Sequence, residues 1–166
     1  MNIILLKIIK NDLKFYGGTS PYKVVITFLF RPTFRLMLNY RLGHYLISKN
    51  NKFLNLIVSY LKYVQTTKRN CQISYESILG EKITFPHPIG LVIGKNVVIE
   101  NEVTIYQNVT LGQTKEGLYP LVKKGTVIYP NSVVVGDIVL EQNTVVGALS
   151  FINKSTKVNE VIFNKK

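Results

Sequence analysis

The sequence predicts a mainly β protein: a left-handed parallel β-helix preceded by a small α-helical cap at the amino terminus. Three observations lead to this prediction. A six-residue repeat fills the second half of the chain, the repeat is broken twice, and the first half is basic with apolar residues at helical spacing. An internal repeat of fixed period determines the architecture before any local assignment is made. We expect residues 1–70 to form the cap and residues 71–166 to form the β-helix.

The six-residue repeat runs in one frame through residues 122–163. Each hexad opens with an aliphatic residue, and the fifth position is small or β-branched. The opening positions are Val122, Ile128, Val134, Leu140, Val146, Ile152 and Val158. Three six-residue faces close one coil of a prism, and successive coils pair as parallel strands about 4.8 Å apart. The opening residues are therefore expected to point inward, and an ordinary antiparallel sheet is the disfavoured alternative.

The same frame runs upstream through residues 73–114 and is broken at two places. Its opening residues are Ile73, Leu79, Phe85, Ile93, Ile99, Ile105 and Leu111. Two extra residues interrupt it within residues 86–92, and a longer break covers residues 115–121. Loops that leave a rigid scaffold often carry function, and the only histidine of the repeat region, His87, lies in the first break.

The first half contains four stretches with helical spacing of apolar residues, so four helices are predicted. They cover residues 2–16, 22–30, 33–48 and 53–67. Arg35 and Arg41 are expected on the surface of the third helix. Asp12 is the only acidic residue in residues 1–70 and is expected to pair with an arginine; a role in binding the acceptor is the disfavoured alternative.

The net charge of +12 is unevenly distributed. Residues 1–70 hold eight Lys and four Arg against one Asp, which gives +11, whereas residues 71–166 hold nine Lys against eight acids, which gives +1. Because the basic residues alternate with large apolar ones, we expect residues 1–70 to contact an anionic membrane surface. A solvated basic face on the cap explains the same pattern. The sequence contains no recognised nucleic-acid-binding motif, so no nucleic-acid partner is expected.

The sequence predicts a cytoplasmic location, with peripheral contact at the inner face of the membrane. Its single cysteine, Cys71, cannot form a disulfide within the chain. It shows no secretory signal and no apolar run near the roughly 18 residues that span a bilayer.

Residues 73–114 and 119–148 closely resemble the serine acetyltransferase branch of the hexapeptide-repeat acyltransferases. Residues 40–46, Tyr-Arg-Leu-Gly-His-Tyr-Leu, resemble the helix that precedes the repeat in that branch. The most specific match is the insertion that carries a histidine followed by Gly-x-Val-Ile-Gly. The resemblance implies a homotrimer that transfers acetyl from acetyl-CoA to a hydroxyl, without a metal, in grooves between neighbouring prisms.

The same resemblance assigns roles to individual residues. His87 matches the catalytic base, which fits its chemistry: a histidine with a pKa near 6.5 can take a proton from a hydroxyl and return it to a thiolate. Lys123 and Lys124 are expected either to meet a CoA phosphate or to be solvated corner residues. The residues expected to bind the cofactor are Gly112, Gln113, Lys123, Lys124, Gly147 and Ala148.

Three positions depart from the serine enzymes. Gln72 stands where the family has an aspartate that orients the histidine, and its amide oxygen can still fix the tautomer. Pro86 and Tyr119 stand where the family has an aspartate and a histidine around the acceptor, so both are candidate acceptor-binding positions. A loop aromatic packed on the prism is the alternative for Tyr119. These departures favour a sugar or surface-polysaccharide acceptor, as in the similar colanic acid and capsule O-acetyltransferases. The alternatives are a serine O-acetyltransferase and a non-catalytic trimeric β-helix scaffold.

Overall fold

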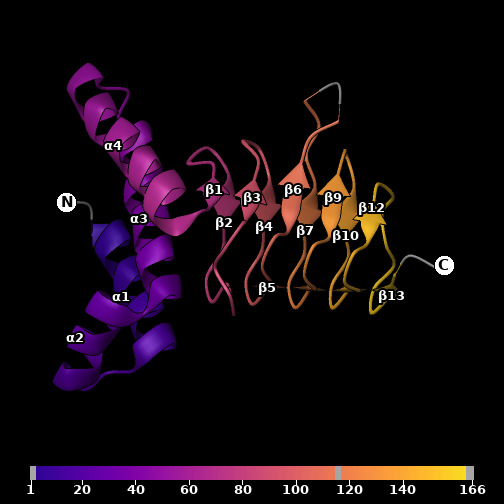
Figure 1. Ribbon diagram of the computed structural model, residues 1–166, viewed down its shortest axis with the longest axis horizontal. Helices are drawn as coiled ribbons and strands as arrows, with labels where there is room; N and C mark the ends of the chain where they lie inside the picture. The colour runs from indigo at the N-terminus through magenta and orange to yellow at the C-terminus, as the bar shows by residue number, and fades with distance from the viewer. Residues whose placement is uncertain (1–2, 115–116, 164–166) are drawn as a thin grey trace.

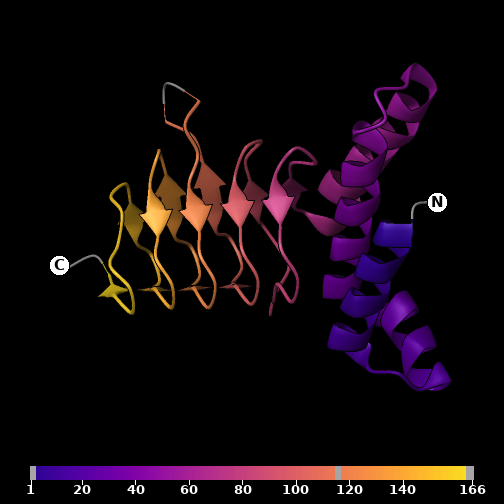
Figure 2. The same cartoon turned by 180° about the vertical axis from the view of Figure 1, so that it is seen from behind.

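The protein is a stack of β-helical coils closed at one end by four helices. A computed structural model describes residues 3–114 and 117–163. The helices lie at one end of the long axis, the coils follow side by side, and β12 and β13 lie at the far end (Figures 1 and 2). The fold predicted from the hexad repeat, a left-handed parallel β-helix with an α-helical cap, is confirmed.

The four predicted helices are confirmed, with ends that differ by only a few residues. They are α1 (Ile3–Gly17), α2 (Pro21–Phe30), α3 (Pro32–Ile47) and α4 (Lys52–Arg69). Proline at the first position begins both α2 and α3, where a missing N–H costs nothing. Asn51 caps α4, since its side-chain oxygen accepts from the Phe53 N–H at 2.8 Å. None of the described helices is both long enough and apolar enough to cross a membrane.

Short parallel strands form the three faces of the prism. The first face has the order β1 (Gln72–Ile73), β3 (Val92–Ile93), β6 (Thr110–Gly112), β9 (Val133–Val135) and β12 (Phe151–Ile152). The second has β2 (Ile78–Leu79), β4 (Val98–Ile99), β7 (Leu121–Val122) and β10 (Val139–Leu140). The third has β5 (Thr104–Ile105), β8 (Val127–Ile128), β11 (Val145–Val146) and β13 (Val161–Ile162).

The hexad-opening residues form the core, with one exception. From Ile73 to Ile152 they are all buried. Val158, which was expected to point inward, is 55% exposed and lies in a turn, so that prediction is wrong. The strand pairing gives the reason: Val146 pairs with Ile162, whereas a full coil of eighteen residues would have brought residue 164 there. The last described coil is therefore two residues short, and Thr156 is buried while Val158 is displaced outward.

The helices supply hydrogen-bond donors to the first coil. In this stack each coil directs most of its carbonyl groups toward the preceding coil, so those of the first coil need another partner. Helix side chains meet this need. The pairs are Tyr40 with Ser77 O at 2.7 Å, Arg41 with Leu79 O and Gly80 O at 2.6 Å each, Thr33 with Phe85 O at 2.8 Å, Tyr16 with Ile83 O, and His44 with Tyr75 O at 2.7 Å.

A buried ion pair holds α1 to α3. Arg41 Nε lies 3.0 Å from Asp12 Oδ2, and both side chains are less than a tenth exposed. The predicted partnership of Asp12 with an arginine is confirmed, but the surface position expected for Arg41 is wrong. Burial raises the pKa of Asp12 above its usual value, and the Arg41 charge partly opposes that shift. Helices and coils share one continuous hydrophobic core, which includes Leu36 and Met37 of α3 together with the inward residues of the coils.

Candidate functional site

His87 lies at an edge of the prism, on the two-residue insertion that the sequence indicated. The insertion separates Phe85 from Ile93, and the His87 carbonyl accepts from the Ile89 N–H at 2.8 Å. The side chain of His87 is exposed. Its ring lies 6.4 Å from the ring of Tyr106, which in turn stacks on Tyr129 at 5.1 Å. The candidate base thus begins a row of aromatic rings that crosses three successive coils.

The residues expected to bind CoA lie on three different edges of the same prism. Gly147 and Ala148 follow β11, so they share the edge of His87 but lie farther along the stack. Gly112 and Gln113 lie where the chain leaves the first face for the second. Lys123 and Lys124 follow β7, at the edge between the second and third faces. One chain alone therefore does not gather these residues around His87.

Both lysines have carboxylate partners within the chain. Lys123 Nζ lies 2.9 Å from Glu141 Oε1, and this pair is partly buried. Lys124 Nζ lies 3.2 Å from Glu102, and that pair is exposed. Of the two readings of these lysines, the geometry favours structural ion pairs, and contact with a CoA phosphate stays a prediction.

The three positions that depart from the serine enzymes lie in different surroundings. Pro86 is exposed and lines the same cleft as His87. Gln72 lines a separate hollow against α4, and no hydrogen bond joins it to His87 among the described residues. The Tyr119 ring packs over Gly94, where an added Cβ would lie 2.6 Å from a ring atom. The tyrosine side chain is therefore packed against the hydrophobic core.

A cleft of about 510 Å³ opens beside His87. Its walls are the first turn of α3, the last turn of α4 and residues 86–89. Three cations line it: Arg35 of α3, and Lys68 and Arg69 of α4. Burial, together with the nearby Arg35 charge, lowers the pKa of Arg69. Sequence reasoning did not assign these three residues to the site, and the only signal was the excess of positive charge in residues 1–70.

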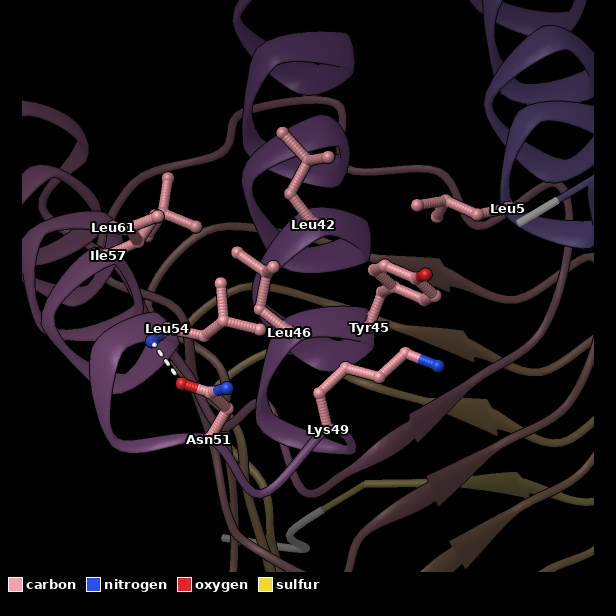
Figure 3. Close-up of a pocket in the computed structure, with 9 residues that line it drawn as sticks. All are labelled: Leu5, Leu42, Tyr45, Leu46, Lys49, Asn51, Leu54, Ile57 and Leu61. Carbon is pink, nitrogen blue, oxygen red and sulfur yellow. Dashed lines mark hydrogen bonds between the residues drawn. The ribbon is translucent and has the colours of Figure 1, made fainter. Parts of the chain in front are cut away.

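A second and larger hollow lies away from His87 and has a different character. It has a volume of about 700 Å³ and opens between α3 and α4, with Leu5 of α1 at its side (Figure 3). Leucine side chains such as Leu42 and Leu54 point into it, while Lys49 and Asn51 lie at its margin (Figure 3). Among the described residues no histidine or carboxylate lines this hollow, so they offer no such group for acid–base chemistry there. The cleft beside His87 is therefore the candidate active site.

Comparison with known proteins gives a consistent group of relatives. The serine acetyltransferase of Buchnera aphidicola subsp. Schizaphis graminum is 31% identical over 160 residues, which cover 93% of this chain and 60% of that protein. The serine acetyltransferase of Haemophilus influenzae is 35% identical over 127 residues, or 75% of this chain and 46% of that protein. The chain thus spans about half to three fifths of the length of these two relatives. No family model matches the chain.

Solved structures agree with these relatives. A serine acetyltransferase structure in complex with CoA superposes with a TM-score of 0.80 at 27% identity, covering 95% of this chain and 66% of the other. These matches support the serine acetyltransferase part of the resemblance and give no support to the surface-polysaccharide branch. The chain is therefore similar in sequence to serine acetyltransferases and has their fold, the left-handed β-helix of the hexapeptide-repeat acyltransferases.

Proposed function

We propose that the protein is an acetyl-CoA-dependent O-acetyltransferase of the serine acetyltransferase type, with the serine hydroxyl as its acceptor. One observation carries this proposal: an exposed histidine stands on the single two-residue insertion of a β-helix homologous to serine acetyltransferases. One such relative was solved in complex with CoA. The comparisons favour serine over the sugar acceptor that the sequence departures suggested.

His87 can perform the proton transfers that this reaction needs. The imidazole takes the proton of the acceptor hydroxyl while the hydroxyl oxygen attacks the thioester carbonyl of acetyl-CoA. The tetrahedral intermediate then collapses, the carbon–sulfur bond breaks, and the imidazolium returns the proton to the CoA thiolate. The products are the O-acetyl ester and CoA, and no metal enters this scheme. General base assistance of this kind is worth roughly 10² to 10⁴ in rate.

The decisive measurement is release of CoA thiol from acetyl-CoA with serine as acceptor. We expect turnover in the wild type and a kcat lower by about 10²- to 10⁴-fold in His87→Ala. Because His87 is exposed, the variant should keep the melting temperature of the wild type. Full activity in His87→Ala would show that another group removes the proton.

A sugar hydroxyl remains a second candidate acceptor, favoured by one feature of the cleft. No carboxylate lines it among the described residues, so no negative charge there is placed to pair with the ammonium group of free serine. Nucleotide-linked and oligomeric surface sugars therefore belong in the same thiol-release assay. Turnover with a sugar and none with serine would replace the preferred acceptor, and failure to bind CoA at all would favour the scaffold alternative.

We infer that the active unit is a homotrimer. The predicted CoA-binding residues lie on three edges of one prism, and a groove between neighbouring prisms can join residues from two edges. Sedimentation equilibrium should give a particle of three chains. A monomer that turns over at low concentration would refute the shared groove.

Peripheral contact with an anionic membrane rests on the amino-terminal helices alone. Large apolar side chains such as Phe30, Phe53 and Tyr60 are more than half exposed in a region that carries most of the net positive charge. Flotation with phosphatidylserine vesicles should carry the protein upward at low salt. The proposal fails if the protein stays at the bottom of the gradient.

A further inference from the structure

The cleft beside His87 is lined by charges of one sign. Arg35, Lys68 and Arg69 contribute three cations, and no Asp or Glu is among its lining residues in the described chain. No described ion pair engages any of the three. The one acid of the helical half, Asp12, is already paired with Arg41. The cluster therefore has no internal counter-charge.

The cations are held in place relative to His87. Thr33 in the first turn of α3 donates to Phe85 O at 2.8 Å, just before the insertion. The Gly90 N–H at the end of the insertion donates to Asn70 O at 2.7 Å, just after α4. Both helix ends that supply the cations are thus hydrogen-bonded to the segment that carries His87.

Arg69 has unused hydrogen-bonding capacity. Its Nε is buried and has no partner in the structure. Arg35 uses one guanidinium nitrogen for Leu29 O at 3.2 Å, which leaves its other donors available. A guanidinium presents its N–H groups in a planar fork that matches a carboxylate or a phosphate. Gathering like charges destabilises the empty cleft, and a bound anion offsets that cost.

We propose that this cleft binds an anionic group of the acceptor, a carboxylate or a phosphate, through Arg35 and Arg69, and thereby holds the acceptor hydroxyl beside His87. The inference rests on the proposed function, because it assigns the anion to the substrate of that reaction. A carboxylate is carried by serine, and a phosphate by a phosphorylated sugar. The phosphates of acetyl-CoA fit less well, since the long pantetheine arm separates them from the thioester that must reach His87.

The first test measures anion binding without any acetyl transfer. Calorimetric titrations of the full chain with inorganic phosphate and with glycolate, a small hydroxy acid, are made at constant ionic strength. We expect saturable binding of at least one anion, weakened tenfold or more in Arg35→Gln and Arg69→Gln. Lys52→Gln, an exposed cation at the opposite end of α4, is the matched control and should bind like the wild type. Absence of saturable binding, or equal binding in all variants, overturns the proposal.

The second test locates the anion in the reaction. Thiol release is compared between serine and serinamide, which lacks the carboxylate, and between a sugar phosphate and the free sugar. Whichever of the two pairs the enzyme acetylates, the acceptor that carries the anionic group should have a KM at least tenfold lower than its uncharged counterpart. Arg69→Gln should abolish that difference in KM. The KM for acetyl-CoA should stay unchanged, and a rise in that KM alone would reassign the cleft to CoA. Failure of all thiol release refutes the proposed function, whereas the binding titration still decides whether the cleft takes anions.

Discussion

Arg41 illustrates how one residue can be misjudged from sequence. Helical spacing placed it on the surface of α3, but the side chain is buried against Asp12 and the carbonyls of Leu79 and Gly80. Its acidic partner lies 29 residues earlier and its carbonyl partners 38 and 39 residues later. Periodicity within one helix carries no information on such distant partners.

Removing one member of this ion pair should be costly. In Asp12→Ala the Arg41 charge stays buried without compensation, so we expect a loss of about 3–5 kcal/mol in the free energy of unfolding. Urea denaturation followed by circular dichroism measures this loss. The double variant Asp12→Ala, Arg41→Met should recover part of it, because no unpaired charge is then left in the core. A loss below about 1 kcal/mol in the single variant would mean that water reaches Arg41.

A close approach between α3 and the first coil makes a second residue-scale prediction. A Cβ added at Gly43 would collide with the ring of Tyr75, which is buried. Gly43→Ala should therefore cost about 1–3 kcal/mol, although alanine favours helices. Gly112→Ala is the control, since its nearest neighbour would be at 3.6 Å. Equal melting temperatures of the two variants would show that α3 can move aside freely.

At the scale of the elements, the hexad pattern predicts the strands more reliably than it predicts the last turn. The opening residues identified the inward face of every strand from β1 to β12. The prediction for Val158 failed because β-branched residues stand at both positions of the last two hexads: Ile152 and Val158 open them, and Thr156 and Ile162 are in fifth place. A two-residue shortening therefore leaves the pattern almost intact, and only the pairing of Val146 with Ile162 reveals it.

The candidate site was predictable from the sequence only where its signal is local. His87 stood out because an insertion interrupts a regular repeat, which is a local signal. The basic cleft did not, because Arg35 and Arg69 come from two helices and meet only where these helices are hydrogen-bonded to the insertion. Packing of Tyr119 on the prism was one of two alternatives, but its partner, Gly94, could not be identified before the coils were stacked.

The junction between the helices and the first coil can be tested through one hydroxyl. Tyr40 donates to Ser77 O at 2.7 Å and accepts from the Leu79 N–H at 3.1 Å. Tyr40→Phe leaves both backbone groups buried without that partner, so a loss of about 1–3 kcal/mol is expected in chemical denaturation. Tyr45→Phe on the same helix has no described hydrogen bond from its hydroxyl and should change the stability by less than about 0.5 kcal/mol.

For the molecule as a whole, a stack supported at one end should open from the other. Each coil contacts only its neighbours, so protection is expected to decrease along the stack. Amide hydrogen exchange should be slowest near β1 and β2, whose coil the helices cover, and fastest in β12 and β13. Uniform protection in all coils would mean that the stack unfolds in one cooperative step.

Because the helices supply hydrogen-bond donors at one end of the stack, they also influence the order in which the chain folds. The amino-terminal half leaves the ribosome first, and domains form largely in order of synthesis. Once α1 to α4 have packed, their side chains present a template whose donors match the carbonyls of the first coil. Each completed coil then offers its N–H groups to the next, so growth has a direction and the strand register is inherited from the template. The helices would thus act as an internal nucleus for the stack as well as its cover.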